Sequence, residues 1–250
     1  MSGKSETTTD GVRAVELFYR DIRRTSDNEP VFLYTQMRLN GPEMGVLEPA
    51  DYRAVSELSD QCSELFALGM HQLLQAMNKF QERDIMFKWA SLYMPVRFLK
   101  RDDAAEKLNG LCGRYKIKPE MLCFEVSASA LEETDGAAAD NMDKLRRKGY
   151  HFMLDDFGTT SSPMLKLADF SFDYAVLSPE IAASVCRNDR AESCVRSVVS
   201  FVKELGAECI AAETTGKDQT ERLFDCECAY YMGELAGTYH AERYMRRKGD

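Results

Sequence analysis

The sequence predicts an α/β fold: a modified, TIM-like (β/α)8 barrel whose first strand runs antiparallel to its neighbour. Three observations support this prediction. The 250 residues are 44% hydrophobic, enough to bury one sizeable core at a length common for such barrels. Strand-like and helix-like segments alternate along most of the chain, as βα-repeating folds require. Only a polar turn, residues 25–30, separates the first two strand-like segments, and such a short link fits an antiparallel pair.

The predicted strands are short runs rich in apolar and β-branched residues, bounded by polar or turn-forming residues. They are Ala14–Ile22, Val31–Asn40, Met86–Met94, Met121–Val126, His151–Asp155, Phe172–Leu177, Glu208–Ala212 and Cys228–Met232. Helical periodicity is clearest in Glu64–Phe80, Ala130–Lys148 and Arg190–Leu205, and glycine follows the last two. We expect residues 1–12 to form a flexible N-terminus and residues 13–250 to form a single barrel domain.

Charge and cysteine usage exclude several function classes. The formal charge is −9, from 32 Lys and Arg against 41 Asp and Glu. This balance disfavours both nucleic-acid binding and attachment to an anionic membrane, which need clustered cations. No apolar run reaches the roughly 18 residues of a membrane span. The eight cysteines are scattered and no signal peptide precedes them, so we expect reduced thiols in a cytoplasmic protein.

Carboxylates stand at the ends of two predicted strands. Asp155 and Asp156 follow an apolar run and precede a glycine turn, and Glu125 ends a second apolar run. Because parallel barrels gather reactive groups at the C-terminal ends of their strands, these three side chains should converge at one mouth. Oxygen-rich clusters of this kind suit Mg²⁺ or Mn²⁺. Spacing alone equally allows carboxylates that cap a helix or pair with arginine.

Five segments, in the right order, resemble the EAL family of cyclic di-GMP phosphodiesterases. Asp155-Asp156-Phe157-Gly158-Thr159 resembles the DDFGT motif that marks the family. The other four are Phe18-Tyr19 for the opening strand, Arg38-Leu39-Asn40 with Gly45–Pro49, Pro119–Glu125 before the E-x-T-E motif, and Phe172-Asp173-Tyr174 for the "vDylKID" strand. The resemblance covers roughly residues 14 to 240.

The resemblance implies a barrel whose members hydrolyse one phosphodiester bond of cyclic di-GMP with two divalent metals. In two-metal hydrolysis the metals bind the phosphate, lower the pKa of a bridging water and stabilise the developing charge. By the family pattern, Glu125, Asp155 and Asp156 correspond to surviving metal ligands. Arg38 corresponds to a contact with the substrate phosphate.

Most other site positions of the family are replaced. The EAL glutamate falls on Tyr34, the strand-three asparagine on Tyr93, and the lysine and aspartate of "KID" on Val176 and Ser178. The two glutamates of "AEGVE" fall on Ala212 and Thr215, with Glu213 one position out; the glutamine of "QGY" falls on Met232. The second glutamate of E-x-T-E falls on Ala128, and the two residues after DDFGT are Thr160 and Ser161. A phenol is a poor Mg²⁺ ligand and valine carries no charge, so hydrolysis should fall by many orders of magnitude.

Three functions stay open. The first is a catalytically degenerate EAL-like domain that acts as a regulatory or protein-interaction module in bacterial signalling. The second is a receptor that binds cyclic di-GMP without cleaving it; Arg38 and the three carboxylates favour it, whereas Arg20 at the opening glutamine position speaks against it. The third is a divalent-metal-dependent hydrolase of cyclic di-GMP or another substrate, built on Glu125, Asp155 and Asp156.

We expect no resident cofactor, weak Mg²⁺ or Mn²⁺ binding at best, and weak binding of any cyclic di-GMP. We expect a protein partner, of unknown identity, that binds outside the mouth or through Thr159–Lys166, where the family forms dimers. Tyr34 and Tyr93 should fill the space of metal and phosphate. At least one of their hydroxyls should bond to Asp155 or Asp156, which would leave a shallow, self-satisfied site.

Overall fold

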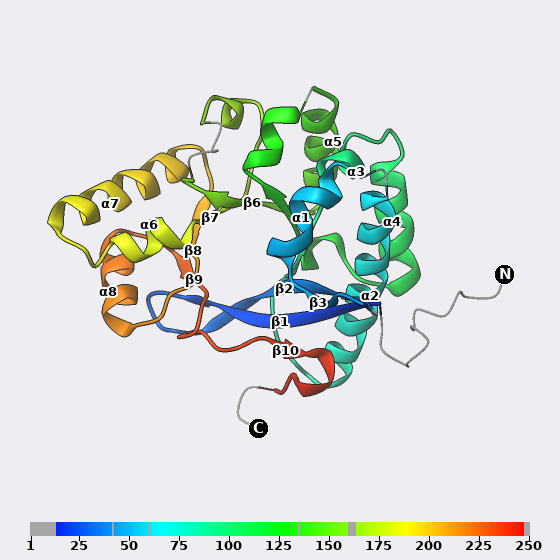
Figure 1. Ribbon diagram of the computed structural model, residues 1–250, viewed down its shortest axis with the longest axis horizontal. Helices are drawn as coiled ribbons and strands as arrows, with labels where there is room; N and C mark the ends of the chain where they lie inside the picture. The colour runs from blue at the N-terminus through cyan, green and yellow to red at the C-terminus, as the bar shows by residue number, and fades with distance from the viewer. Residues whose placement is uncertain (1–13, 42, 60, 135, 160–163, 248–250) are drawn as a thin grey trace.

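The computed structural model describes residues 14–41, 43–59, 61–134, 136–159 and 164–247. Eight strands close into a barrel, because β1 pairs with both β2 and β9 (Figure 1). In chain order the barrel strands are β1 (Val15–Arg24), β2 (Pro30–Gly41), β4 (Ala90–Tyr93), β5 (Leu122–Ser127), β6 (His151–Phe157), β7 (Tyr174–Leu177), β8 (Glu208–Ala211) and β9 (Tyr230–Tyr231). β1 is antiparallel to both neighbours and the other pairs are parallel, which confirms the predicted fold class.

Each of the eight predicted strands overlaps an observed one. Two further short strands lie outside the barrel wall and were not predicted. β3 (Gly45–Leu47) pairs with the end of β2, and β10 (His240–Ala241) pairs with β1, both antiparallel. The expected flexible N-terminus lies outside the described residues.

Helices cover the outside of the barrel. They are α1 (Pro49–Glu57), α2 (Cys62–Glu82), α3 (Val96–Leu99), α4 (Ala104–Tyr115), α5 (Gly136–Arg146), α6 (Pro179–Ser184), α7 (Asp189–Glu204) and α8 (Lys217–Asp225), with 3-10 turns at Pro119–Met121, Ser129–Glu133, Met164–Ala168 and Glu242–Tyr244. In Figure 1, α2, α4 and α5 lie on one side of the barrel, α6, α7 and α8 on the other, and α1 between them. None of the described helices is long and apolar enough to cross a membrane.

Two of the three predicted helices match their observed counterparts closely. The third, Ala130–Lys148, is divided in the structure into the turn Ser129–Glu133 and α5. Thr134 between them is extended, with ψ near 151°. Its buried hydroxyl donates to the carbonyl of Leu131, and this local bond competes with helical hydrogen bonding.

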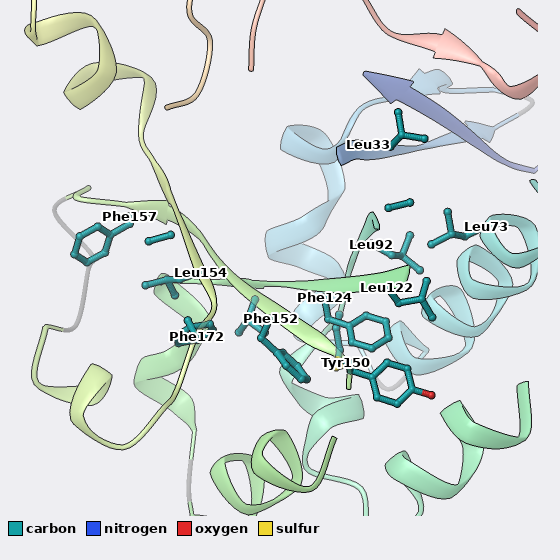
Figure 2. Close-up of a cluster of buried hydrophobic side chains, with 14 of the residues drawn as sticks. Leu33, Leu73, Leu92, Leu122, Phe124, Tyr150, Phe152, Leu154, Phe157 and Phe172 are labelled. Carbon is teal, nitrogen blue, oxygen red and sulfur yellow. The ribbon is translucent and has the colours of Figure 1, made fainter. Parts of the chain in front are cut away.

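The larger core lies between the outer face of the barrel and the helices. Figure 2 shows Phe124 of β5 and Phe152 of β6 next to Leu122 and Tyr150, with Leu73 of α2 in the same layer. Because side chains alternate along a strand, the neighbours of these outward residues must point into the barrel. That alternation fixes which residues reach the site described below.

Inside the barrel, an aromatic layer closes the space below the mouth. The rings of Phe32 and Trp89 stack with centroids 3.9 Å apart, and Tyr174 and Tyr230 meet Phe32 edge-on. The indole Nε1 of Trp89 donates to the hydroxyl of Tyr174 at 3.2 Å, so both polar atoms are satisfied. The interior is therefore filled at this level, and the pocket described next lies at the end formed by the C-termini of the parallel strands.

Candidate functional site

The inward side chains at the strand C-termini form a ring around an open pocket of about 480 Å³. Most ring residues lie two positions after a residue of the interior layer, so one face of the strand carries both. The ring consists of Tyr34, Tyr93, Glu125, Asp155, Val176, Ala212 and Met232. Seven of the positions singled out in the sequence thus meet at one mouth.

Glu125 is fully buried, and both of its carboxylate oxygens have partners. The hydroxyl of Ser91 donates to Oε1 at 2.6 Å, and Nη2 of Arg53 donates to Oε2 at 3.1 Å. Burial raises the pKa of Glu125, the charge of Arg53 lowers it, and repulsion from Asp155 raises it again. The anionic form in this buried place therefore depends on Arg53.

The adjacent aspartates do not share one role. Asp155 is buried on the inner face of β6, and its Oδ2 accepts from Nη1 of Arg53 at 2.9 Å. Asp156 has a left-handed φ of 56°, beside a register shift between β6 and β7, and its side chain is exposed at the rim of the pocket. Partial desolvation of its carboxyl and repulsion from Asp155 raise the pKa of Asp156, and the charge of Arg53 lowers it.

A single guanidinium thus joins the two buried carboxylates. Arg53 lies in the middle of α1, its side chain is 19% exposed, and its Cζ lies 4.3 Å from the centroid of the Tyr93 ring. Neither α1 nor Arg53 was identified from the sequence. The partners of Arg53 are 72 and 102 residues away, so no local spacing points to them. The one available signal was general: a close carboxylate pair needs a metal or an arginine.

The two tyrosines are buried, and the Tyr34 hydroxyl donates a hydrogen bond to the carboxylate of Glu125. The Tyr93 hydroxyl donates to Oε1 of Glu57 at the end of α1, not to an aspartate. Burial and the charges of Asp155 and Glu125 raise the pKa of Tyr34 well above its usual range. The predicted tyrosine–aspartate bond was wrong for Tyr93 because Asp155 already pairs with a full positive charge, which a neutral phenol cannot displace.

Both rings line the open pocket of about 480 Å³, so they do not fill the whole mouth. The reason is geometric. Arg53 lies over Tyr93 in a cation–π contact and holds that ring at the side of the mouth.

Comparison with known proteins assigns the chain to a family. The sequence profile described as EAL domain matches residues 11–239, which is most of the chain. The chain belongs to the EAL domain family.

Its relatives in the family include phosphodiesterases. It is 25% identical over 198 residues to the cyclic di-GMP phosphodiesterase RocR of Pseudomonas aeruginosa, a match that covers 79% of this chain and 50% of that protein. It is 23% identical over 175 residues to the cyclic di-GMP phosphodiesterase PdeR of Escherichia coli, covering 70% of this chain and 26% of that protein. The chain thus spans about half the length of RocR and about a quarter of the length of PdeR.

Solved EAL structures share the fold. The EAL enzyme Bd1971, in a form bound to cAMP and cyclic di-GMP, superposes with a TM-score of 0.81 at 18% identity, covering 92% of this chain and 63% of that one. The FimX EAL domain of Pseudomonas aeruginosa, bound to cyclic di-GMP, superposes with a TM-score of 0.79 at 11% identity, covering 92% and 91%. At these identities the likeness concerns the barrel alone.

One side of this EAL mouth is apolar. Val176, Ala212 and Met232 come from the adjacent strands β7, β8 and β9, and all three are buried while lining the pocket. Ala128, at the end of β5, is also buried, and its N–H donates to the carbonyl of Asp155. This side of the mouth offers no side-chain oxygen from these four positions.

Two other replaced positions support local structure. Ser178 is the N-cap of α6, and its hydroxyl accepts from the N–H of Ile181. Thr215 is exposed, and its N–H donates to the side chain of Gln219. Thr160 and Ser161 lie outside the described residues.

Glu213 does not join the ring. It has a left-handed φ of 48°, is about half exposed, and pairs with Arg20 through both carboxylate oxygens at 2.7 and 3.3 Å. Arg20 is 5% exposed and lies over the Tyr239 ring with its Cζ 4.4 Å from the centroid. The Arg20–Glu213 pair therefore forms part of the pocket rim, and the Glu213 carboxylate is bound to Arg20 and not to the ring around Asp155.

Arg38 lies farther from the centre than its family role implies. Its guanidinium stacks on Phe18 at 4.2 Å, donates to Gln36 at 2.8 Å, and pairs with Glu48 at 3.3 Å. Gln36 and Glu48 line the pocket, whereas Arg38 lies behind them. The expected phosphate-contact residue is thus engaged by neighbouring side chains.

The ring does not fit the two metals that the family pattern implies. Within the described residues, no group of three or more His, Cys, Asp or Glu side chains has a geometry that could hold a metal ion. The two buried carboxylates direct Oε2 of Glu125 and Oδ2 of Asp155 to Arg53. Mg²⁺ demands near-octahedral oxygen coordination, and the remaining ring is phenol, valine, alanine and methionine.

Proposed function

We propose that this chain is a catalytically degenerate EAL domain that acts in bacterial signalling as a regulatory module, through protein contacts. The observation that carries the proposal is the composition of the ring, in which side chains without a metal-binding group occupy most strand ends. Hydrolysis of a phosphodiester by this family's chemistry depends on electrostatic stabilisation by metals. A ring whose two buried carboxylates are both paired with one arginine has too little negative charge to hold two divalent metals.

The direct test is a hydrolysis assay. Purified protein is incubated with cyclic di-GMP and Mn²⁺, and the linear dinucleotide is sought by chromatography, with an active EAL phosphodiesterase as the positive control. We expect no product above the buffer blank. Turnover near that of the control enzyme, abolished by Asp155→Asn, would refute the proposal.

A second function, a receptor for cyclic di-GMP, is favoured by one observation. The pocket of about 480 Å³ lies within the usual size range of small-molecule sites. Arg20 and Arg53 line it, and the Nε–H group of each is buried and has no hydrogen-bond partner among the described residues. Donors of this kind stabilise a bound acceptor.

Thermal shift separates the two functions. The melting temperature is measured with and without cyclic di-GMP, in EDTA and in Mg²⁺. A saturable rise in EDTA that Arg20→Ala removes would favour the receptor. An unchanged melting temperature in both buffers is the result expected of a domain that acts through protein contacts.

A further inference from the structure

α1 is held on the barrel mainly by polar side chains. Tyr52 is the one buried residue of this helix, and its hydroxyl donates to the carbonyl of Met37 at 2.8 Å. The other attachments are ionic or hydrogen-bonded: Arg53 to the two buried carboxylates, and Glu57 to the Tyr93 hydroxyl. The helix thus lies over the mouth with Arg53 as its central contact.

The buried carboxylates require a positive charge at this place. Glu125 has no exposed surface and Asp155 is 5% exposed, so water cannot solvate either anion effectively. An unpaired buried charge is strongly unfavourable, and two like charges make it worse. A divalent metal and a guanidinium are alternative solutions, and this chain supplies the guanidinium from α1.

The geometry of the contact excludes using both solutions at once. Nη1 and Nη2 of Arg53 lie 2.9 Å from Asp155 and 3.1 Å from Glu125, so one planar group bridges both side chains. The other oxygen of Glu125 already accepts from Ser91. A divalent ion would need these same carboxylates at about 2.0–2.6 Å, and its charge would repel the guanidinium.

We propose that Arg53 is the built-in cation of the mouth and that it excludes Mg²⁺ and Mn²⁺ from Glu125 and Asp155 for as long as α1 is docked. The inference deepens the proposed function and rests on it in one respect, that the mouth works without a metal. A guanidinium is charged at every pH at which the fold exists, so the exclusion is permanent in the intact protein. It follows that removing one side chain uncovers a latent carboxylate site for a divalent ion.

The probe is Mn²⁺ alone, followed by the loss of the free-ion signal in electron paramagnetic resonance. Wild-type protein should reduce the free Mn²⁺ signal no more than the Glu125→Gln variant does. Arg114→Ala, which removes an exposed arginine elsewhere, should behave like wild type. Arg53→Ala should bind Mn²⁺ at least about ten times more tightly. Addition of Glu125→Gln to Arg53→Ala should abolish the gained binding.

A second readout follows α1 itself. Hydrogen exchange of the backbone amides of residues 50–57 should accelerate in Arg53→Ala, and added Mn²⁺ should not slow it, because the ion cannot attach the helix. Should Arg53→Ala fail to fold, Arg53→Gln, which keeps most of the length without the charge, is measured in its place.

Two results would overturn the proposal: Mn²⁺ binding by wild-type protein that Glu125→Gln removes, or a folded Arg53 variant that binds no more Mn²⁺ than wild type. The outcome is independent of the hydrolysis assay. Hydrolysis of cyclic di-GMP by wild-type protein with no Mn²⁺ bound at the mouth would refute only the proposed function. Mn²⁺ binding at the wild-type mouth without hydrolysis would refute only this inference. Low Mn²⁺ affinity in wild type together with the gain in Arg53→Ala is the result we expect.

Discussion

Individual side chains decide the chemistry of this mouth, and Arg53 matters most among them. It pairs with both Glu125 and Asp155, stacks on Tyr93, and attaches α1. A phenol, by contrast, contributes no charge, so Tyr34 hydrogen-bonds to Glu125 without replacing the arginine. Substitution of Arg53 should therefore have a clear effect on the free energy of unfolding.

Arg53→Ala should destabilise the protein by about 3 kcal/mol, because removing one partner of a buried ion pair leaves uncompensated charge behind. The free energy of unfolding is measured by urea titration. Arg114→Ala, at an exposed position on α4, is the matched control and should change it by less than about 0.5 kcal/mol. Equal effects of the two substitutions would show that the bridge contributes nothing to stability.

The loss of unfolding free energy in Arg53→Ala should also depend on pH. Burial already raises the pKa of Glu125, and loss of Arg53 removes the main influence that lowers it. A carboxyl with a raised folded pKa favours folding when protonated, and this contribution is lost as pH rises through the folded pKa. The difference in unfolding free energy between wild type and Arg53→Ala should therefore be smaller at pH 5 than at pH 8. If this difference did not change with pH, the titration of Glu125 would not contribute to the lost stability.

At the scale of elements, the sequence predicted the parts whose pattern is local. Apolar runs such as His151–Asp155 and the stripe in Arg190–Leu205 correspond to β6 and α7 because burial on both faces, or on one helical face, is written in consecutive residues. β3 and β10 are three and two residues long and exist through pairing with β2 and β1. Such short strands carry no periodicity of their own.

The candidate site divides in the same way. Glu125 and Asp155, expected at the mouth because they end their strands, lie on one ring with Val176, Ala212 and Met232, which were identified through the family resemblance. The separation of Asp156 from Asp155 depends on a left-handed φ, and the position of Arg53 depends on how α1 crosses the mouth. Both are set by tertiary packing, which single-sequence patterns do not contain. The contact segment Thr159–Lys166 is described only at its ends, where Met164 and Leu165 are exposed.

One turn shows how tightly the element ends are fitted. Gly233, directly after Met232, has a φ of +140°, and a Cβ added there would lie 2.2 Å from the backbone nitrogen of Thr214. Gly237 has a similar φ of +132°, but an added Cβ would meet nothing within 4 Å. The pair separates steric clash from backbone strain.

Gly233→Ala should therefore cost about 3 kcal/mol of unfolding free energy, from strain and a clash with backbone that cannot move aside. Gly237→Ala should cost about 1 kcal/mol, from strain alone. Chemical denaturation of both variants gives the comparison. Similar losses in the two proteins would mean that the β9 end can move away from Thr214.

At the scale of the whole molecule, the chain has an EAL barrel whose buried mouth carboxylates pair with an arginine. Closure of β1 onto β2 and β9 and the aromatic layer around Trp89 form the architecture below the mouth. Above that layer, phenols and aliphatic side chains make up most of the ring, and α1 supplies a cation. Function resides in the site and not in the fold, so a barrel shared with phosphodiesterases is compatible with a different role.

Arg53, and not a metal, pairs with both buried carboxylates of the mouth. A crystal structure of wild-type protein grown with Mn²⁺ and cyclic di-GMP, with anomalous data collected at the manganese edge, tests this pairing most directly. We expect no anomalous peak beside Glu125 and Asp155, and clear density for the Arg53 guanidinium between them. Two coordinated manganese ions at the mouth, with Arg53 displaced from both carboxylates, would contradict it.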